Sequence, residues 1–328
     1  MNDEAIGSIV VVGSTNWDIT MYLPTLPLPG ETVGSGRLQS GLGGKGANQA
    51  VAAHRAGGVE TIFLSCIGDD DIALSVRQVF ASLAMDIAHV VEVNDAGTGS
   101  ACIFVNAEGE NCIGVASGAN TALDPAFIHS HKTVIGGARI VLAQLEIPLA
   151  SVEALAELCA DSPATFVLNP APARPLPDTL LARVDVLTPN EGELGQLSGM
   201  PVGDDAALVL AARSLCDKGV GTVIVTLGPR GCLIVSSSSA EFVDGFTVTA
   251  VDTTAAGDVF NGALVAEMIR GQSLSAAAVT GCKAAALAVM SAGAIASIPT
   301  REQVLAFVPR AFVPRAFVPR AFVPPAGH

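Results

Sequence analysis

Charged and aromatic side chains are scarce in this chain of 328 residues. Charged residues make up 15% of the sequence and aromatic residues 4%, with a single Trp and a single Tyr. The 17 basic residues are outnumbered by 31 acidic ones, which gives a formal net charge of −14. Such a surface repels phosphate backbones, so the composition argues against general nucleic-acid binding. A phosphorylated ligand must therefore be held by local positive potential, from backbone N–H groups, a cation or a few Lys and Arg side chains.

Paired cysteines and clustered histidines are also missing. The cysteines are odd in number and widely spaced, without a C-x-x-C motif, and the only close pair of histidines is His129 and His131. A metal site needs further ligands, and none surrounds this pair. We therefore expect the two histidines on a loop or the surface, and reduced thiols in or near the core. The seven cysteines are Cys66, Cys102, Cys112, Cys159, Cys216, Cys232 and Cys282.

No stretch has the pattern of a leader or of a membrane span. Acidic residues, not basic ones, precede the short apolar run near the N-terminus, and no apolar run approaches the roughly 20 residues that cross a bilayer. We therefore expect a cytoplasmic protein without a membrane segment. Half of the residues are hydrophobic, which suffices for one large α/β domain or two smaller ones.

Strand and helix patterns alternate along most of the chain. This alternation predicts an α/β fold with a mainly parallel sheet that is covered by helices on both faces. Ligands bind such sheets beyond the carboxyl ends of the strands, where Glu146, Asn169, Asn190 and Gly228 fall. The predicted strands span residues 8–13, 60–68, 87–93, 138–146, 164–172, 184–190 and 220–228, with hairpins at 100–115 and 232–243. The predicted helices span residues 46–56, 69–84, 150–161, 204–219, 256–270 and 274–292.

Residues 19–40 interrupt this alternation. Pro and Gly punctuate the segment, and only Thr20–Leu23, Glu31–Gly34 and Arg37–Ser40 have a strand pattern. We expect a small twisted sheet outside the main core, with Trp17 packed at the junction between the two.

The segment 306–325 is a repeat of five residues, beginning AFVPR. Proline at every fifth position forbids a continuous helix and interior sheet pairing, and a period of five produces no apolar stripe. We interpret residues 306–328 as an extended, largely disordered appendage without chemistry; a partner-binding motif is the alternative.

The glycine-rich stretch SGLGGKGANQA (residues 40–50) leads into a predicted helix. Lys45 is followed by Gly, so the Walker A pattern is absent. The stretch is either a flexible turn or a site where backbone amides, Lys45 and Asn48 surround a small polar ligand. Asn16 and Asp18 follow the first predicted strand and offer donors and acceptors that suit hydroxyl groups, as on a sugar.

Two further motifs lie between the glycine-rich stretches. In LTPNEGE, Asn190 and Glu193 stand three apart at a helix start, which suits hydrated magnesium and phosphate oxygens but is also an ordinary N-cap pattern. VTLGPRG (residues 225–231) ends a strand with a Gly-Pro turn. It is either a simple hairpin or part of a nucleotide site.

The stretch VDTTAAGDVF (residues 251–260) places three small residues and Asp258 at a helix start. We expect the N–H groups of Ala256, Gly257 and Asp258 to point outward, where the helix dipole favours an anion such as a phosphoryl group. Asp258 beside it could accept a proton from an attacking hydroxyl. A capped turn is the alternative, because Asp is common in the first turn of helices.

Together these segments resemble the ribokinase-like sugar kinases of the phosphofructokinase B type. The resemblance covers residues 8–304 and rests on four motifs in family order, GGKGANQAVAA, TPNEGE, TLGPRG and DTTAAGDVFNGAL. It implies a three-layer αβα sandwich with a mainly parallel central sheet. A small β-sheet lid would come from segments near 19–40 and 98–116, all within one domain over 1–305.

The resemblance also implies ATP-dependent phosphorylation of the 5-hydroxyl of D-ribose. Asp258 would be the catalytic base, with an anion hole formed at Ala255, Ala256 and Gly257. The implied ribose ligands are Asn16, Asp18, Gly44, Lys45, Gly46, Asn48, Glu146 and Asp258. The implied nucleotide contacts are Asn190, Thr226, Leu227, Gly228, Pro229, Arg230, Gly231, Gly257 and Cys282.

The resemblance also implies two kinds of bound cation, Mg²⁺ and K⁺, and a homodimer. Glu193 would support Mg²⁺ through water, and the lid would pair with that of a second copy in a homodimer. The residues that match the family's monovalent-cation (K⁺) site are Asp252, Thr254, Ala288, Ser291, Gly293 and Ser297.

Two departures and several alternatives accompany this interpretation. Trp17 stands where smaller residues are usual in the family, and Cys282 stands where a histidine often borders adenine. The acceptor could instead be deoxyribose, another sugar or a nucleoside. A non-catalytic sensor would lack the base, yet Asp258 is present, and no paired spacing of cysteines supports a thiol-regulated binding protein.

Overall fold

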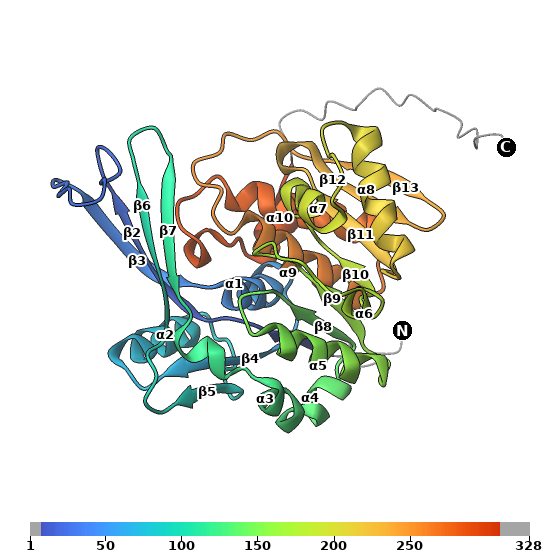
Figure 1. The fold of residues 1–328 in the computed structure, drawn as a ribbon, viewed down its shortest axis with the longest axis horizontal. Coiled ribbons are helices and arrows are strands. Elements are labelled where there is room, and N and C mark those ends of the chain that lie inside the picture. Colours follow the sequence, from blue (N-terminus) through green and yellow to red (C-terminus); the bar gives the residue numbers. More distant parts are fainter. Residues whose placement is uncertain (1–7, 309–328) are drawn as a thin grey trace.

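The computed structural model describes residues 8–308, which build a nine-stranded sheet and a separate four-stranded sheet (Figure 1). The central sheet has the order β13-β12-β11-β10-β9-β8-β1-β4-β5. Its pairs are parallel from β5 to β11, and β12 and β13 add an antiparallel edge. The prediction of a mainly parallel sheet is therefore confirmed. The strands are β1 (Ile9–Val12), β4 (Thr61–Gly68), β5 (Val90–Val93), β8 (Ile140–Ala143), β9 (Thr165–Leu168), β10 (Val186–Leu187), β11 (Thr222–Thr226), β12 (Gly231–Ser236) and β13 (Ala240–Asp244).

Helices cover both faces of this sheet, as the alternating pattern predicts. Side chains alternate across β1, so that Ile9 and Val11 enter one apolar cluster and Val10 and Val12 enter the other. The first cluster packs against α1 (Lys45–Val51), the π-helical turn Ala52–Ala56 that continues it, α2 (Asp71–Ser82), α9 (Ala256–Ile269), α10 (Leu274–Ala288) and α11 (Arg301–Ala306). The second packs against α3 (Pro125–Ser130), α4 (Lys132–Gly136), α5 (Leu149–Ala160), α6 (Asp178–Leu181), α7 (Glu191–Ser198) and α8 (Asp205–Asp217). Short 3₁₀ turns occur at Gly118–Ala122, Gly228–Arg230 and Ile295–Ser297.

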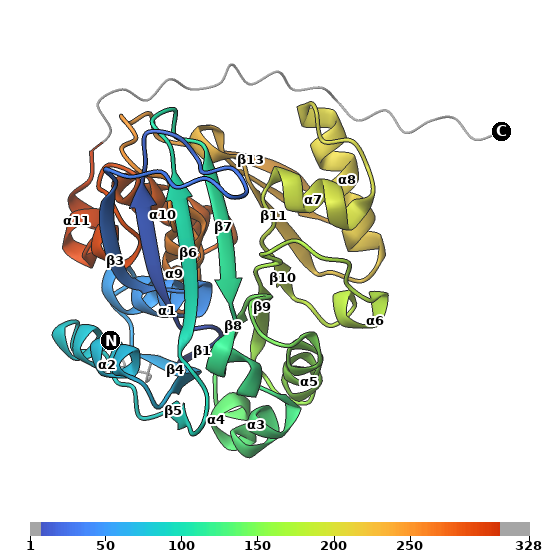
Figure 2. The same ribbon diagram turned by 60° about the vertical axis from the view of Figure 1, so that its left-hand side comes forward.

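The second sheet projects from the end of β1 and forms the lid (Figure 2). Its strands are β2 (Asn16–Tyr22), β3 (Arg37–Gly43), β6 (Gly99–Val105) and β7 (Asn111–Ala116), in the order β3-β2-β6-β7. Only β2 and β6 pair in parallel. Trp17 on β2 packs against the first apolar cluster, at the junction where it was expected.

The predicted strand Glu31–Gly34 does not form. The chain turns at Pro29 and Gly30 instead, where Gly30 has φ +83° and the Glu31 N–H donates to the Leu28 carbonyl over 2.9 Å. The Glu31 carboxylate in turn accepts the Leu28 N–H over 3.0 Å. The local turn therefore satisfies backbone groups that the strand prediction assigned to a sheet.

Other predictions differ in smaller ways. The helices α3 and α4 were not predicted, and His129 lies exposed on α3. All seven cysteines are free thiols, but Cys102 and Cys112 are exposed on the lid rather than placed near the core. Within residues 8–308 no helix is long and apolar enough to cross a bilayer. The appendage predicted at 306–328 lies outside the described residues from 309 onward.

Candidate active site

Polar side chains converge at the carboxyl ends of the central strands. Glu146 follows β8, Asn169 follows β9, Asn190 follows β10 and Gly228 follows β11. Glu146 and Asn169 reach residues of the glycine-rich stretch at 40–50 through hydrogen bonds described below. The parallel sheet therefore places the predicted polar residues at one edge, as expected.

Glycines let the start of α1 lie directly against the end of β1. A Cβ on Gly46 would lie 2.3 Å from the Gly13 carbonyl carbon, and a Cβ on Gly44 would lie 2.7 Å from the Asn16 nitrogen. Gly44 also has φ +88°, a conformation that favours glycine. The close approach lets Glu146 accept two hydrogen bonds on Oε2, from the Ser14 hydroxyl at 2.6 Å and the Lys45 N–H at 2.9 Å. Glu146 thus binds the first turn of α1 where the helix dipole favours an anion.

The first strand of the lid carries Asn16 and Asp18 into the same cleft. Asn16 is buried, and its Oδ1 accepts a hydrogen bond of 2.8 Å from Asn120 Nδ2. Burial, together with the charges of Glu146 and Asp258, raises the pKa of Asp18 to about 6. A carboxylate with a raised pKa beside other carboxylates is typical of a functional site.

Asp258 lies in the first turn of α9, where its carboxylate is almost fully buried. The N-cap residue of α9, Ala255, has φ +60°, a left-handed conformation that is strained for a non-glycine residue. Asn48 Nδ2 donates to Asp258 Oδ2 over 3.0 Å, and Gln49 Nε2 donates to Oδ1 over 2.9 Å. Burial raises the pKa of Asp258, while Lys45 and these two amide donors act against the increase.

Lys45 is the cation of this cluster. Burial alone would lower its pKa, but four carboxylates together outweigh burial and raise it: Asp258, Glu146, Glu193 and Asp18. Lys45 therefore stays protonated at neutral pH and supplies positive charge inside an otherwise acidic protein.

The start of α9 presents backbone donors, with one correction to the prediction. The Ala256 N–H donates to the Thr253 carbonyl over 3.3 Å and is not free. Among the described residues, no acceptor binds the N–H groups of Gly257 and Asp258. A Cβ on Gly257 would meet no atom within 4 Å, so open space lies beside these two donors. The helix start can therefore accept an anion at Gly257 and Asp258.

An apolar cavity of about 270 Å³ opens at the same helix start. Several residues predicted to contact the nucleotide line this cavity, namely Thr226, Gly228, Pro229, Gly231, Gly257 and Cys282. Its walls also include Phe260 from the motif at 251–260 and residues outside every motif, namely Gly245, Phe246, Thr247, Val248, Ala250, Ala285, Ala286 and Val289. Apolar walls with few polar groups suit the flat face of a nucleobase.

Three other residues predicted to contact the nucleotide do not line this cavity. Leu227 is buried in the second apolar cluster, and Arg230 forms ion pairs with Glu191 and Asp205. Asn190 and Glu193 form a reciprocal capping box at the start of α7, with both hydrogen bonds at 2.8 Å. The ordinary N-cap interpretation of this motif is therefore correct locally. Glu193 nevertheless acts electrostatically on Lys45, and burial raises its own pKa.

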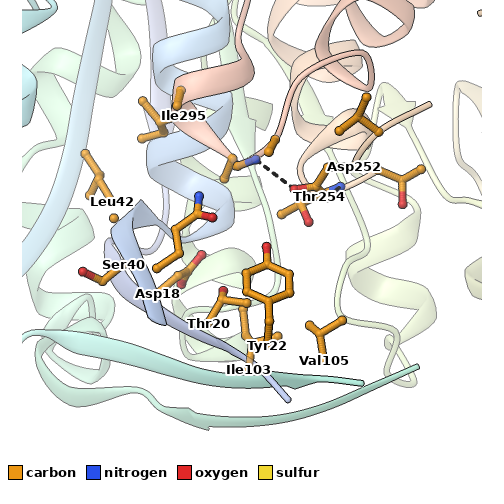
Figure 3. A pocket seen from close by; sticks show the side chains of 18 of the residues that line it. Asp18, Thr20, Tyr22, Ser40, Leu42, Ile103, Val105, Asp252, Thr254 and Ile295 are labelled. Carbon is orange, nitrogen blue, oxygen red and sulfur yellow. Dashed lines mark hydrogen bonds between the residues drawn. The ribbon is translucent and has the colours of Figure 1, made fainter. Parts of the chain in front are cut away.

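The residues of the predicted cation site come together only in part. Asp252 Oδ1 accepts the Thr254 N–H over 2.9 Å, and its Oδ2 accepts the Gly293 N–H over 2.8 Å, the bond drawn in Figure 3. These hydrogen bonds lower the pKa of Asp252 although burial alone would raise it. The other three residues have local partners: the Ala288 carbonyl accepts the Ser291 N–H, and the Ser297 hydroxyl donates to Ala294.

A larger cavity, of about 800 Å³, separates the lid from these loops. Thr20, Tyr22 and Ile103 line it from the lid, and Asp252 and Thr254 line it from the opposite side (Figure 3). Asp18 also lines this space, so the cleft around Asp18 is open toward it.

Sequence reasoning missed the side chains that support the site. Ser14, Gln49, Asn120 and Gln144 all donate or accept hydrogen bonds within it. Gln49 lies next to Asn48, and Gln144 lies near the end of the predicted strand 138–146, so position along the chain was the only signal available for them.

Comparison with known proteins agrees with this geometry. Residues 7–301 match the model of the family described as pfkB family carbohydrate kinase. The chain belongs to this family. The chain is also 41% identical to the ribokinase of Haemophilus influenzae over 304 residues, which cover 93% of this chain and 99% of that protein. It is 36% identical to the deoxyribokinase of Salmonella typhi, over 90% of this chain and 96% of that protein.

A solved structure of another member supports the fold. The ribokinase of Arabidopsis thaliana, complexed with ribose and ATP, superposes with a TM-score of 0.86 at 31% identity. The match covers 91% of this chain and 97% of that one. The ribokinase-like fold, with a mainly parallel sheet and a lid sheet, is therefore confirmed, and the chain is an ATP-dependent sugar kinase of the ribokinase-like type.

Proposed function

We propose that this protein transfers the γ-phosphoryl group of ATP to the 5-hydroxyl of D-ribose. The observation that carries the proposal is the position of Asp258, buried in the first turn of α9 beside two unpaired backbone N–H groups. A base, an anion site and an apolar cavity then meet at one helix start. The 41% identity to a ribokinase supports ribose as the acceptor.

The reaction requires the base and the anion site together. The sugar O5 forms a bond to the γ-phosphorus, the bond from that phosphorus to the bridging oxygen breaks, and ADP leaves with the electron pair. The hydroxyl proton passes to the Asp258 carboxylate. The Gly257 and Asp258 N–H groups hold the charge on the transferring phosphoryl oxygens, and Lys45 adds a nearby positive charge.

The ribose ligands would be the side chains and backbone groups that surround this base. Asn48 supports this assignment, because its Oδ1 is buried without a hydrogen-bond partner among the described residues and can accept a sugar hydroxyl. Asp18 and Glu146 are further acceptors, since sugar hydroxyls are donors. The full proposed set is Asn16, Asp18, Gly44, Lys45, Gly46, Asn48, Glu146 and Asp258.

The nucleotide would lie in the 270 Å³ cavity with its phosphates at Gly257. Magnesium would neutralise phosphate charge when bound, and the acidic side chain of Glu193 fits a role in holding its water ligands. A potassium ion would take oxygen atoms from the loops that Asp252 joins. That ion would stiffen the loop that leads into Gly257.

The lid would also pair two copies of the chain. Its edge strands expose large apolar side chains, with Leu38 61%, Ile113 53% and Val115 57% accessible. Ile113 and Val115 share one face of the lid, which borders the larger cavity, and Leu38 lies on the opposite face. Exposed apolar groups on a small sheet are typical of an interface. We expect light scattering to report a dimer for the wild type and a monomer for Ile113→Asp.

An ADP-release assay over several acceptors tests the proposal. Ribose, deoxyribose, fructose, adenosine and uridine are each supplied with ATP and Mg²⁺, with and without K⁺. We expect the highest kcat/KM with ribose and stimulation by K⁺. The 36% identity to a deoxyribokinase makes deoxyribose the second candidate. A higher kcat/KM with deoxyribose would replace ribose as the acceptor while leaving the chemistry intact.

A further inference from the structure

A chain of buried amide side chains leads from the central sheet to Asp258. Gln49 Nε2 donates to Asp258 Oδ1 over 2.9 Å and to Asn169 Oδ1 over 3.1 Å. Gln49 Oε1 accepts a hydrogen bond of 2.7 Å from Gln144 Nε2. Gln49 and Gln144 are both fully buried, at 0% exposure, so neither can bind a ligand in the cleft directly.

The partners of Gln49 allow only one orientation of its amide group. If the amide turned over, its oxygen would face the Asp258 carboxylate and its nitrogen would face the Gln144 nitrogen. The contacts of that oxygen with the Asp258 carboxylate and with Asn169 Oδ1 would be repulsive, and the bond from Gln144 Nε2 would lose its acceptor. Asn169 is fixed as well, because its Nδ2 donates to the Thr188 carbonyl over 2.8 Å and leaves Oδ1 for Gln49. Gln144 and Asn169 therefore hold the Gln49 donor toward the base.

The same network continues to the anion site. The Thr188 hydroxyl donates to Asn261 Oδ1 over 2.7 Å, and Asn261 Nδ2 donates to the Gly257 carbonyl over 2.8 Å. Buried networks of this kind favour a single geometry, since any displaced member leaves a further polar group unpaired. Within the network, only Gln144 Oε1 and Asn48 Oδ1 lack a partner among the described residues. The network thus joins the two functional parts of the start of α9.

We propose that Gln49 is a positioning residue, which fixes the Asp258 carboxylate toward the sugar hydroxyl, and that Gln144 fixes Gln49 in turn. This inference rests on the proposed function, because it takes Asp258 as the base. Asn48 differs from Gln49 in that it holds the other carboxylate oxygen and keeps a free acceptor for substrate.

Replacing Gln49 should shift the pKa of Asp258, and a residue with only a structural role would cause no such shift. Burial raises the pKa of Asp258, and the Gln49 donor is one of the groups that oppose the increase. Four charged residues act on Asp258 from the surrounding elements: Lys45 on α1, Asp18 on β2, Glu146 after β8 and Glu193 on α7. None of these residues changes when Gln49 is replaced. A shift of the pH profile of kcat between variant and wild type therefore reports the loss of the Gln49 donor.

The test compares Gln49→Met with the wild type, because Met keeps the length of the side chain and removes the donor. The readouts are kcat and the ribose KM from pH 5.5 to 9.5, with the melting temperature of each variant. We expect kcat at pH 7 to decrease roughly 10- to 100-fold, the acid limb of the profile to move up by about one pH unit, and part of the activity to return at high pH. The ribose KM should change less than threefold.

Two further variants keep the test decisive. Gln144→Met should move the acid limb of the pH profile in the same direction by a smaller amount. This variant takes the place of Gln49→Met in the test if the Gln49→Met protein does not fold. Ser151→Ala removes a buried hydrogen bond to the Leu123 carbonyl, which involves no residue of the site, and should lower the melting temperature without moving the pH profile. An unshifted profile in both Gln variants would overturn the inference.

Asp258→Asn separates this inference from the proposed function. If Asp258→Asn is inactive while Gln49→Met has the profile of the wild type, only the positioning role fails. If Asp258→Asn is as active as the wild type, the proposed base is wrong and both fail.

Discussion

The sugar end and the nucleotide end of the candidate site are built from different chemistry. The sugar end gathers four ionisable side chains, Asp18, Lys45, Glu146 and Asp258, each of which acts electrostatically on at least one of the others. The cavity at the nucleotide end has no acidic or basic side chain among its lining residues. Fixed polar groups discriminate strictly between ligands, whereas apolar walls select mainly by shape. We therefore expect substitutions at the sugar end to have the larger effects.

The largest effect should come from Asp258→Asn. The variant keeps the shape of the side chain but cannot accept the hydroxyl proton, so kcat should decrease about 10³- to 10⁴-fold. Calorimetry should show ribose binding within a fewfold of the wild type. Asp217→Asn, on the exposed end of α8, is the matched control and should leave kcat unchanged.

The boundary between the two ends is tested by Gly257→Ala. A methyl group there meets no protein atom within 4 Å, so the melting temperature should stay close to that of the wild type. The methyl group would occupy the space proposed for the phosphoryl group, and kcat/KM for ATP should decrease roughly 10- to 100-fold. A variant with normal ATP kinetics would show that the phosphate lies elsewhere.

Glu146→Gln should weaken the sugar end alone. The substitution removes the charge that accepts hydrogen bonds from Ser14 and Lys45, and hydrogen bonds to charged groups contribute about 1.5–3 kcal/mol. We expect the ribose KM to increase at least tenfold with little change in the ATP KM. Glu157→Gln, on the exposed side of α5, serves as the control.

The raised pKa of Asp18 predicts a pH dependence of sugar binding. The ionised carboxylate accepts sugar hydroxyls, so the ribose KM should increase up to tenfold per pH unit as the pH falls below about 6. A folded-state pKa above the ordinary value also means that ionised Asp18 destabilises the fold once the pH rises through about 6. Asp18→Asn should therefore flatten the profile of the KM and raise the melting temperature at pH 8. A lower melting temperature would contradict the predicted cost of the buried charge.

The smallest effect is expected from changing the base of the nucleotide. No amide or charged side chain lines the cavity to read the edge of the base, so kcat/KM for ATP and GTP should differ by less than about 100-fold. The comparison is made at saturating ribose. A difference above about 10⁴-fold would mean that fixed polar groups also read this ligand.

The sequence predicted the parts of the site that depend on local chain geometry. Gly44, Lys45 and Asp258 lie in short motifs whose turns and helix starts are set by neighbouring residues, and a helix begins at each of these motifs. Gln49 and Gln144 could not be assigned, because their roles depend on a contact across 95 positions of the chain.

Part of the nucleotide cavity could not be predicted either, because it also depends on contacts between segments far apart in the sequence. Phe246 lies outside every motif, and it reaches the cavity only because the chain after β13 returns to α9 and α10. The failed strand at Glu31–Gly34 shows the opposite error, where a strand pattern gave way to a Pro-Gly turn.

The position of the transferred phosphate tests the central claim most directly. The protein is incubated with ATP, Mg²⁺, K⁺ and ribose, and the product is analysed by phosphorus–carbon couplings in NMR spectra. The account predicts one product, with the phosphate on O5 of ribose, formed in equal amount to the ADP released. A phosphate on another hydroxyl, or ADP release without a sugar phosphate, would contradict it.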